Sequence, residues 1–273
     1  MAEVAGHFAL KYLREEALPT PFCPGCGCGI VANCFLKAVE ELGFNDLSEF
    51  VFCSGIGCSS WIPSPHFKAD TIHALHGRSI PVAMGVKLVR PDRRVVVFGG
   101  DGDLAGIGLS HLIHAARRNL EVVVIMVNNM IYGMTGGQTA PTTPQGSYTS
   151  TAPYGNLEPS MDVARLVADA GASYSARWTV AHPHRLKEAI KRALTKRGFA
   201  YVEAVSQCPT HYGRRNKMAR PADMMRWMLA NSVPLERAGE EPGKIPVGVY
   251  VDRDRPGFVE TYWSMVRELS GGR

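Results

Sequence analysis

The amino-acid sequence predicts a doubly wound α/β fold, in which helices cover both faces of a mainly parallel sheet. Three observations indicate this class. Short runs rich in Val, Ile and Phe alternate with stretches in which apolar residues recur at helical spacing. Glycine-containing turns follow several of the strand-like runs. Hydrophobic residues make up 45% of the 273 residues and charged residues 20%, which is the balance of a chain that can bury a core.

The first predicted elements lead into a glycine loop. Residues 29–42 have the pattern of an amphipathic helix. The run Phe50–Cys53 suits a buried strand, and the loop Ser54-Gly55-Ile56-Gly57 follows it. Residues 80–88 are expected to form a helix, with Pro81 in its first turn.

A β–α–β unit is the clearest feature of the sequence. Arg94–Phe98 is a β-branched strand followed by the turn Gly99–Asp103, and Glu121–Val127 is a second strand that ends at Asn128-Asn129. Between the strands, apolar or small residues recur at helical spacing at Ala105, Gly108, Leu109, Leu112, Ile113 and Ala116. This order predicts two parallel strands joined by a helix.

The alternation continues beyond a long loop. Residues 135–160 are rich in Thr, Pro, Gly and Ser, and are expected to form a functional loop or lid. Helices are predicted at 161–170 and 184–197, and strands at 173–180 and 199–205. The residues after 220 contain several prolines, and we expect them to be irregular and to wrap the domain or a partner.

Charge and hydropathy narrow the possible functions. The formal net charge of +5 suits an acidic protein partner better than a nucleic acid. The longest strongly apolar stretch, Val122–Val127, is far too short to cross a membrane. The N-terminal residues up to Glu16 carry charges throughout and lack the pattern of a signal peptide. We therefore expect a cytoplasmic protein.

Two strand ends predict a site for Mg²⁺ and a diphosphate. Asp101 and Asn129 each follow a parallel strand, so their side chains can converge on one ion in the crevice at the strand ends. Their oxygens are hard ligands that suit Mg²⁺. Gly100 and Gly102 allow close approach of a diphosphate, and a helix starting near Asp103 would present free N–H groups.

Two other interpretations of this turn remain open. It could be an ordinary glycine-containing β–α turn. It could also belong to a dinucleotide site, since Gly100-x-Gly102-x-x-Ala105 matches the loose fingerprint. A dinucleotide site requires an acid at the end of the next strand, where Asn128-Asn129 stands instead, while Glu121 lies at the opposite edge. The pattern favours Mg²⁺ and diphosphate.

The seven cysteines predict a metal site, because disulfides are rare in a reducing compartment. The run Cys23-Pro24-Gly25-Cys26-Gly27-Cys28-Gly29 contains a C-x-x-C pair whose glycines leave N–H groups free to face sulfur. Cys208-Pro209 is a weaker signal, and spacing leaves zinc and iron–sulfur open. Cys34 and Cys53 are expected to be buried apolar residues, and the same is favoured for Cys28.

Several motifs together resemble the β subunit of the 2-oxoacid:ferredoxin oxidoreductases. They occur in the family's order: Phe22-Cys23-Pro24-Gly25-Cys26-Gly27, Ser54-Gly55-Ile56-Gly57-Cys58-Ser59-Ser60, His76-Gly77-Arg78, Gly100-Asp101-Gly102-Asp103, Asn128-Asn129-x-Ile131-Tyr132-Gly133-Met134-Thr135-Gly136-Gly137-Gln138 and Gln207-Cys208-Pro209-Thr210. The stretches around Cys58 and Tyr132 look most like the 2-oxoglutarate branch. The resemblance implies the pyrophosphate-domain type of thiamine-diphosphate fold over residues 1–220, with 221–273 as a C-terminal extension.

The resemblance also implies the site residues. Cys23, Cys26, Cys58 and Cys208 would bind one [4Fe–4S] cluster. Asp101, Asn129 and the carbonyl of Ile131 would hold Mg²⁺. The residues that would line thiamine diphosphate are Ile56, Gly57, Cys58, Ser59, His76, Gly100, Asp101, Gly102, Asp103, Asn129, Ile131, Tyr132 and Gly133.

Substrate contacts are expected at Trp61, Arg78, Met134 and Thr135. Many family members have a basic residue where this chain has Trp61. Arg78 or a partner residue would then have to bind the substrate carboxylate, and Trp61 could equally be a packing aromatic.

The implied activity is the reversible, coenzyme A-dependent oxidative decarboxylation of 2-oxoglutarate to succinyl-CoA and CO₂, with reduction of ferredoxin. No glutamate here is a convincing activator of the cofactor, so an α subunit is expected to supply it together with the coenzyme A contacts. Pyruvate or branched-chain 2-oxoacids are alternative substrates. A thiamine-diphosphate lyase or synthase without redox chemistry, and a non-catalytic module stiffened by zinc, are the alternative functions.

Two groups of basic residues have mainly structural interpretations. Arg214, Arg215, Lys217 and Arg220 follow Cys208; a solvated or subunit-contacting face is favoured, and docking of an acidic ferredoxin is the alternative. His111 and His114 are expected to be packed or surface residues of a helix.

Overall fold

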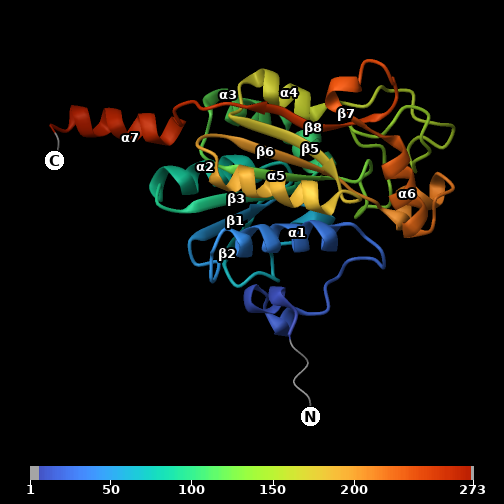
Figure 1. Cartoon of the computed structure of the whole chain (residues 1–273), viewed down its shortest axis with the longest axis horizontal. Coiled ribbons are helices and arrows are strands. Elements are labelled where there is room, and N and C mark those ends of the chain that lie inside the picture. Colours follow the sequence, from blue (N-terminus) through green and yellow to red (C-terminus); the bar gives the residue numbers. More distant parts are fainter. Residues whose placement is uncertain (1–5, 272–273) are drawn as a thin grey trace, which may run out of the picture.

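The computed structural model describes residues 6–271. One eight-stranded sheet runs through the molecule in the order β2-β1-β3-β4-β6-β5-β8-β7 (Figure 1). All neighbouring strands are parallel except β5 and β8. The strands are β1 Phe50–Ser54, β2 Asp70–His73, β3 Arg94–Gly100, β4 Val123–Asn128, β5 Tyr174–Thr179, β6 Ala200–Val205, β7 Ser232–Pro234 and β8 Ile245–Asp252. The predicted doubly wound, mainly parallel α/β fold is confirmed.

Helices cover both faces of the sheet. The α-helices are α1 Cys28–Glu41, α2 Ser79–Val89, α3 Leu109–Arg118, α4 Val163–Ala170, α5 Pro183–Thr195, α6 Pro221–Asn231 and α7 Phe258–Leu269. Buried residues of α1 and α5 pack with Phe52 and Phe98 on one face, and buried residues of α2, α3 and α4 pack with Val97 and Val124 on the other. Apolar side chains on both faces explain why the central strands read as continuous hydrophobic runs.

The segment after the diphosphate turn differs from the prediction. Gly102–Ile107 forms a π-helical turn, Gly106 leaves helical geometry, and α3 begins only at Leu109. The apolar spacing from 105 to 116 therefore belongs to two helical pieces separated by a kink. π-helical turns of this kind often occur at functional sites.

The C-terminal residues are more regular than expected. The segment after 220 contributes α6, two strands and α7, and β8 extends the main sheet by pairing antiparallel with β5. Its prolines do not prevent this, because Pro221 occupies a first helical turn and Pro246 lies near the start of a strand. Figure 1 shows α7 projecting away from the sheet.

Candidate cofactor and cluster site

The carboxyl ends of β1, β3 and β4 meet at one edge of the sheet and form a cavity of about 180 Å³. Every residue predicted to line thiamine diphosphate lies in its wall, together with Val127, Met134 and Thr135. Gly100, the last residue of β3, is in register with Val127 of β4, which brings the two following turns side by side. This crevice is where parallel α/β sheets bind their ligands.

Asp101 is a buried carboxylate without a basic partner. It is 2% exposed, and Thr142 Oγ1 donates a hydrogen bond of 2.5 Å to its Oδ2. Burial raises the pKa of Asp101 to about 7. No Lys, Arg or His within residues 6–271 forms an ion pair with it. A divalent cation at this position would hold the carboxylate ionised.

The turn after β4 brings Asn129 and Ile131 to the same cavity. Between them Met130 has a φ of 63°, a left-handed conformation that non-glycine residues rarely adopt. The side chains of Asn128 and Asn129 support the turn, because their Oδ1 atoms accept hydrogen bonds from the N–H groups of Met130 and Ile131. Strain held at such a turn is typical of ligand sites.

Asp103 connects three loops around the cavity. Its Oδ1 accepts hydrogen bonds from His76 Nδ1 at 2.7 Å, Gly77 N at 2.7 Å and Ile56 N at 3.2 Å. A Cβ atom at Gly55 would lie 2.2 Å from Asp103 Oδ2, so the loop after β1 needs glycine there. The sequence predicts that Asp103 lies in the cavity wall, but it gives no sign of the hydrogen bonds by which Asp103 connects the loops.

A second cavity, of about 260 Å³, brings the four predicted cluster ligands together. Cys23, Cys26, Cys58 and Cys208 all line it. A Cβ atom at Gly133 would lie 3.7 Å from the Sγ atoms of both Cys58 and Cys208. The remaining lining residues are Pro21, Phe22, Trp61, Asn129, Gly133, Met134, Pro209, Thr210 and His211.

Burial and mutual proximity affect the thiols. Burial raises the pKa of Cys58 to about 11 and also raises that of Cys208, and neighbouring thiolates add to both shifts. Holding several of these groups as thiolates therefore requires a positively charged centre. Within residues 6–271, no three His, Cys, Asp or Glu side chains are grouped closely enough to share one metal ion.

The other cysteines lie outside this cavity. Cys34 and Cys53 are buried in the two halves of the core, as predicted, and burial raises their pKa values to about 11 and about 12. Cys28, the first residue of α1, is also buried. Its hydrogen bond to Cys26 lowers the pKa of Cys26 to about 7. Cys28 is thus a neighbour of a proposed ligand as well as a core residue.

Of the four residues expected to contact substrate, three line the two cavities and one does not. Met134 lines both cavities, Thr135 lines the cofactor cavity and Trp61 lines the cluster cavity. Arg78 lines neither; its guanidinium donates to the carbonyls of Gly77 and Ile107. The structure therefore gives no support to Arg78 as a carboxylate-binding residue within this chain. His111 and His114 lie on α3 and also line neither cavity.

Comparisons with known proteins decide the family. The family model described as "Thiamine pyrophosphate enzyme, C-terminal TPP binding domain" matches residues 55–204. A 2-oxoglutarate synthase subunit KorB from Methanocaldococcus jannaschii is 52% identical over 268 residues, covering 96% of this chain and 98% of that protein. This chain belongs to the KorB family of 2-oxoglutarate synthase subunits.

Further matches agree with membership of the KorB family. The KorB subunit of Methanothermobacter thermautotrophicus is 54% identical over 267 residues, covering 96% of this chain and 93% of that protein. The solved 2-oxoglutarate:ferredoxin oxidoreductase from Magnetococcus marinus, with 2-oxoglutarate, coenzyme A and succinyl-CoA bound, has a TM-score of 0.86. It is 34% identical, and the match covers 100% of this chain and 94% of that chain.

Proposed function

We propose that this chain is the subunit of a 2-oxoglutarate:ferredoxin oxidoreductase that holds Mg²⁺, thiamine diphosphate and one [4Fe–4S] cluster. The enzyme converts 2-oxoglutarate and coenzyme A to succinyl-CoA and CO₂, and passes the electrons to ferredoxin. The observation that carries the proposal is the shared wall of the two cavities: Cys58, Asn129, Gly133 and Met134 line both. Carbon chemistry and electron transfer would then take place on opposite sides of the same residues.

The first cavity has the features that a magnesium-bound diphosphate requires. Asp101, Asn129 and the carbonyl of Ile131 offer hard oxygen ligands at one edge of the sheet. Two buried atoms in the wall, Ser59 Oγ and Asp103 Oδ2, have no hydrogen-bond partner within the described part of the chain. Buried polar atoms are normally satisfied, so these two support a bound polar ligand.

The second cavity fits a cubane cluster better than a single zinc ion. Zinc holds its sulfur ligands at about 2.3 Å, which requires the four thiols to close around one point. In this chain they are spread over the wall of a cavity of about 260 Å³, and residues 6–271 contain no closed three-ligand group. A four-iron cluster would be held by these four thiols and would supply the positive charge that buried thiolates need.

The bound groups and the protein have separate tasks. Thiamine diphosphate supplies a nucleophilic carbon and an electron sink for decarboxylation, and the cluster accepts electrons one at a time. The protein orients these groups and excludes water from them. The hydrogen bond from His76 Nδ1 to Asp103 fixes the imidazole, so that Nε2 is the free nitrogen that can hold a proton at the cavity wall.

An α subunit would complete the site. No glutamate of residues 6–271 lines the cofactor cavity, so the acid that activates the cofactor would come from the partner. Ile56 and Met134 in the cavity wall, and the nearby Ile107, are 41%, 46% and 54% exposed. Such an apolar rim is typical of a surface that another chain covers.

Exposed cations beside the cluster cavity would bind ferredoxin. His211 lines this cavity. Burial lowers the pKa of His211, and the charges of Arg215 and Arg214 lower it further, which indicates that both arginines lie close to His211. Arg214, Arg215 and Lys217 form no ion pair within residues 6–271, whereas Arg220 pairs with Asp223 at 2.7 Å. The three free cations form a surface for an acidic carrier next to the cluster.

Assay of the chain co-expressed anaerobically with its α subunit tests this function. Coenzyme A-dependent reduction of ferredoxin with 2-oxoglutarate, faster than with pyruvate or branched-chain 2-oxoacids, is the expected result. Preference for another 2-oxoacid would contradict the substrate assignment. Conversion of the 2-oxoacid by a colourless protein, without reduction of any acceptor, would indicate the non-redox lyase instead. None of the helices in residues 6–271 is long and apolar enough to span a bilayer.

A further inference from the structure

A buried ion pair lies beside the turn that carries the proposed magnesium ligands. Arg177 of β5 and Glu203 of β6 are 5% and 1% exposed. Arg177 Nε lies 3.0 Å from Glu203 Oε1, and Arg177 Nη2 lies 3.0 Å from Glu203 Oε2. Removing one member of such a pair leaves a buried charge uncompensated. Neither residue lines the cofactor or the cluster cavity.

Arg177 is held on its other side as well. Its Nη2 donates to Asp162 Oδ1 and its Nη1 to Tyr250 Oη, both at 2.6 Å. Asp162 is the N-cap of α4, and Tyr250 belongs to β8. The guanidinium is therefore fixed by three elements, and it fixes the Glu203 carboxylate in turn.

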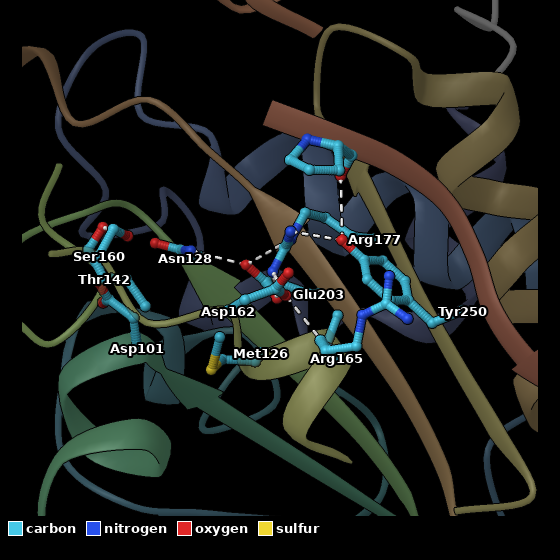
Figure 2. Close-up of polar contacts among 12 residues, drawn as sticks. Asp101, Met126, Asn128, Thr142, Ser160, Asp162, Arg165, Arg177, Glu203 and Tyr250 are labelled. Atoms are coloured by element: carbon cyan, nitrogen blue, oxygen red, sulfur yellow. Dashed lines mark hydrogen bonds and ion pairs between the residues drawn. The ribbon is translucent and has the colours of Figure 1, made fainter. Parts of the chain in front are cut away.

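The carboxylate of Glu203 determines how the side chain of Asn128 is oriented. Asn128 Nδ2 donates a hydrogen bond of 2.8 Å to Glu203 Oε1 (Figure 2). Because an ionised carboxylate only accepts hydrogen bonds, it selects the nitrogen of the amide. The amide oxygen of Asn128 is then free to accept from Met130 N at 3.1 Å.

This hydrogen bond supports the strained part of the metal-binding turn. Met130 is the residue with a φ of 63°, and Thr143 Oγ1 holds its carbonyl from the other side at 2.7 Å. The conformation at Met130 sets the directions of the Asn129 side chain and the Ile131 carbonyl, which flank it in the chain. An amide of Asn128 turned the other way would place an N–H group against Met130 N and would leave the turn unsupported.

We propose that Glu203 is a positioning residue for the metal site: anchored by Arg177, it orients Asn128 and thereby holds the turn that presents Asn129 and Ile131 to Mg²⁺. The inference rests on the proposed function, because it assumes that Mg²⁺ binds at this turn. Neighbours that orient metal ligands commonly change metal affinity roughly 10–100-fold when they are substituted.

The test compares variants of the co-expressed complex in Mg²⁺ affinity, measured by calorimetry with thiamine diphosphate present. Asn128→Asp places two acceptors against each other, and Glu203→Leu removes the acceptor that selects the amide nitrogen. Each is expected to weaken Mg²⁺ binding roughly 10–100-fold.

Ser175→Ala is the matched control. It removes a buried hydrogen bond from β5 to the carbonyl of Ala164, outside the contacts of Arg177, Glu203 and Asn128, so it is expected to lower the melting temperature and leave Mg²⁺ affinity unchanged. Affinities of both single variants equal to wild type would overturn the inference. A wild-type complex that binds no Mg²⁺ with thiamine diphosphate would instead contradict the proposed function itself.

Discussion

The thiols of Cys58 and Cys208 approach the same side of Gly133, where a Cβ atom would lie 3.7 Å from each sulfur. The two cysteines come from elements far apart in the chain, the 3₁₀ turn after β1 and the start of the π-helical turn that follows β6. A cluster bound to both would occupy the space next to this glycine, which also lines the cofactor cavity.

Substitution of Gly133 should therefore affect the cluster more than the fold. In Gly133→Ala the methyl group meets its neighbours at ordinary contact distance, so the melting temperature should change little. The iron content after anaerobic purification should fall by more than half, because the methyl group takes cluster space. Gly85→Ala on α2, where a Cβ atom has no neighbour within 4 Å, is the control and should retain its iron. Equal iron content in both variants would count against the assigned cluster position.

The buried carboxylate of Asp101 should make Mg²⁺ binding depend on pH. Its pKa is raised to about 7 in the folded metal-free protein, so the proton stabilises that state. This contribution is complete at low pH and is lost as pH rises toward 7, by roughly 4 kcal/mol in total. Mg²⁺ must displace the proton, so its apparent affinity should rise up to about tenfold per pH unit below 7 and then level off.

Calorimetry at pH 6 in two buffers of different ionisation enthalpy measures how many protons are released when Mg²⁺ binds. Binding of Mg²⁺ with thiamine diphosphate should release close to one proton from Asp101. Asp101→Asn should bind the metal weakly and without that release. A wild-type affinity that is flat between pH 5.5 and about 7 would show that Asp101 is already ionised without metal.

Asp103 should be needed for the loops as well as for the cofactor. In Asp103→Ala the single oxygen that accepts from His76 Nδ1, Gly77 N and Ile56 N is lost. The cost should be roughly 1–3 kcal/mol of unfolding free energy, together with weaker thiamine-diphosphate binding. Asp92→Ala, which breaks only surface pairs with Arg90 and Arg93, should be nearly neutral. Similar melting temperatures for the two variants would refute the assigned role of Asp103.

The cations after Cys208 should control the reaction with ferredoxin alone. Arg214→Glu/Lys217→Glu should raise the KM for ferredoxin on the order of tenfold at low salt, and less at high salt. The rate with a small artificial one-electron acceptor should stay at the wild-type value. Arg117→Glu/Arg118→Glu on α3 makes the same charge change elsewhere. Equal losses with both acceptors would favour the structural interpretation of this surface.

The sequence was most informative where parallel strands end. The sequence predicts that Asp101 and Asn129 lie in the same crevice, because the carboxyl ends of neighbouring parallel strands meet at one edge of the sheet. The four cysteines needed the family resemblance, since a single C-x-x-C pair does not identify its distant partners. The π-helical turn at 102–107 escaped prediction because apolar spacing tolerates a kink at Gly106.

Strand order explains what else could not be foreseen. In the sheet β6 lies between β4 and β5, so Glu203 reaches both Asn128 and Arg177 although β4 and β6 are not consecutive in the chain. The only signal in the sequence is one charged residue in each of two strands, Arg177 in β5 and Glu203 in the otherwise apolar β6. The prolines after 220 predict irregular structure, yet Pro246 lies within β8. The strand β2 has little signal because it is a short, polar edge strand.

The most direct test of the account follows the visible absorbance of the anaerobic α–β complex when 2-oxoglutarate and coenzyme A are added without ferredoxin. The account predicts a brown protein that bleaches on the time scale of one catalytic turnover and regains its colour when oxidised ferredoxin is added. Bleaching is expected because electrons from the substrate enter a cluster held by Cys23, Cys26, Cys58 and Cys208. Formation of succinyl-CoA with an unchanged spectrum, or by a protein without iron, would contradict it.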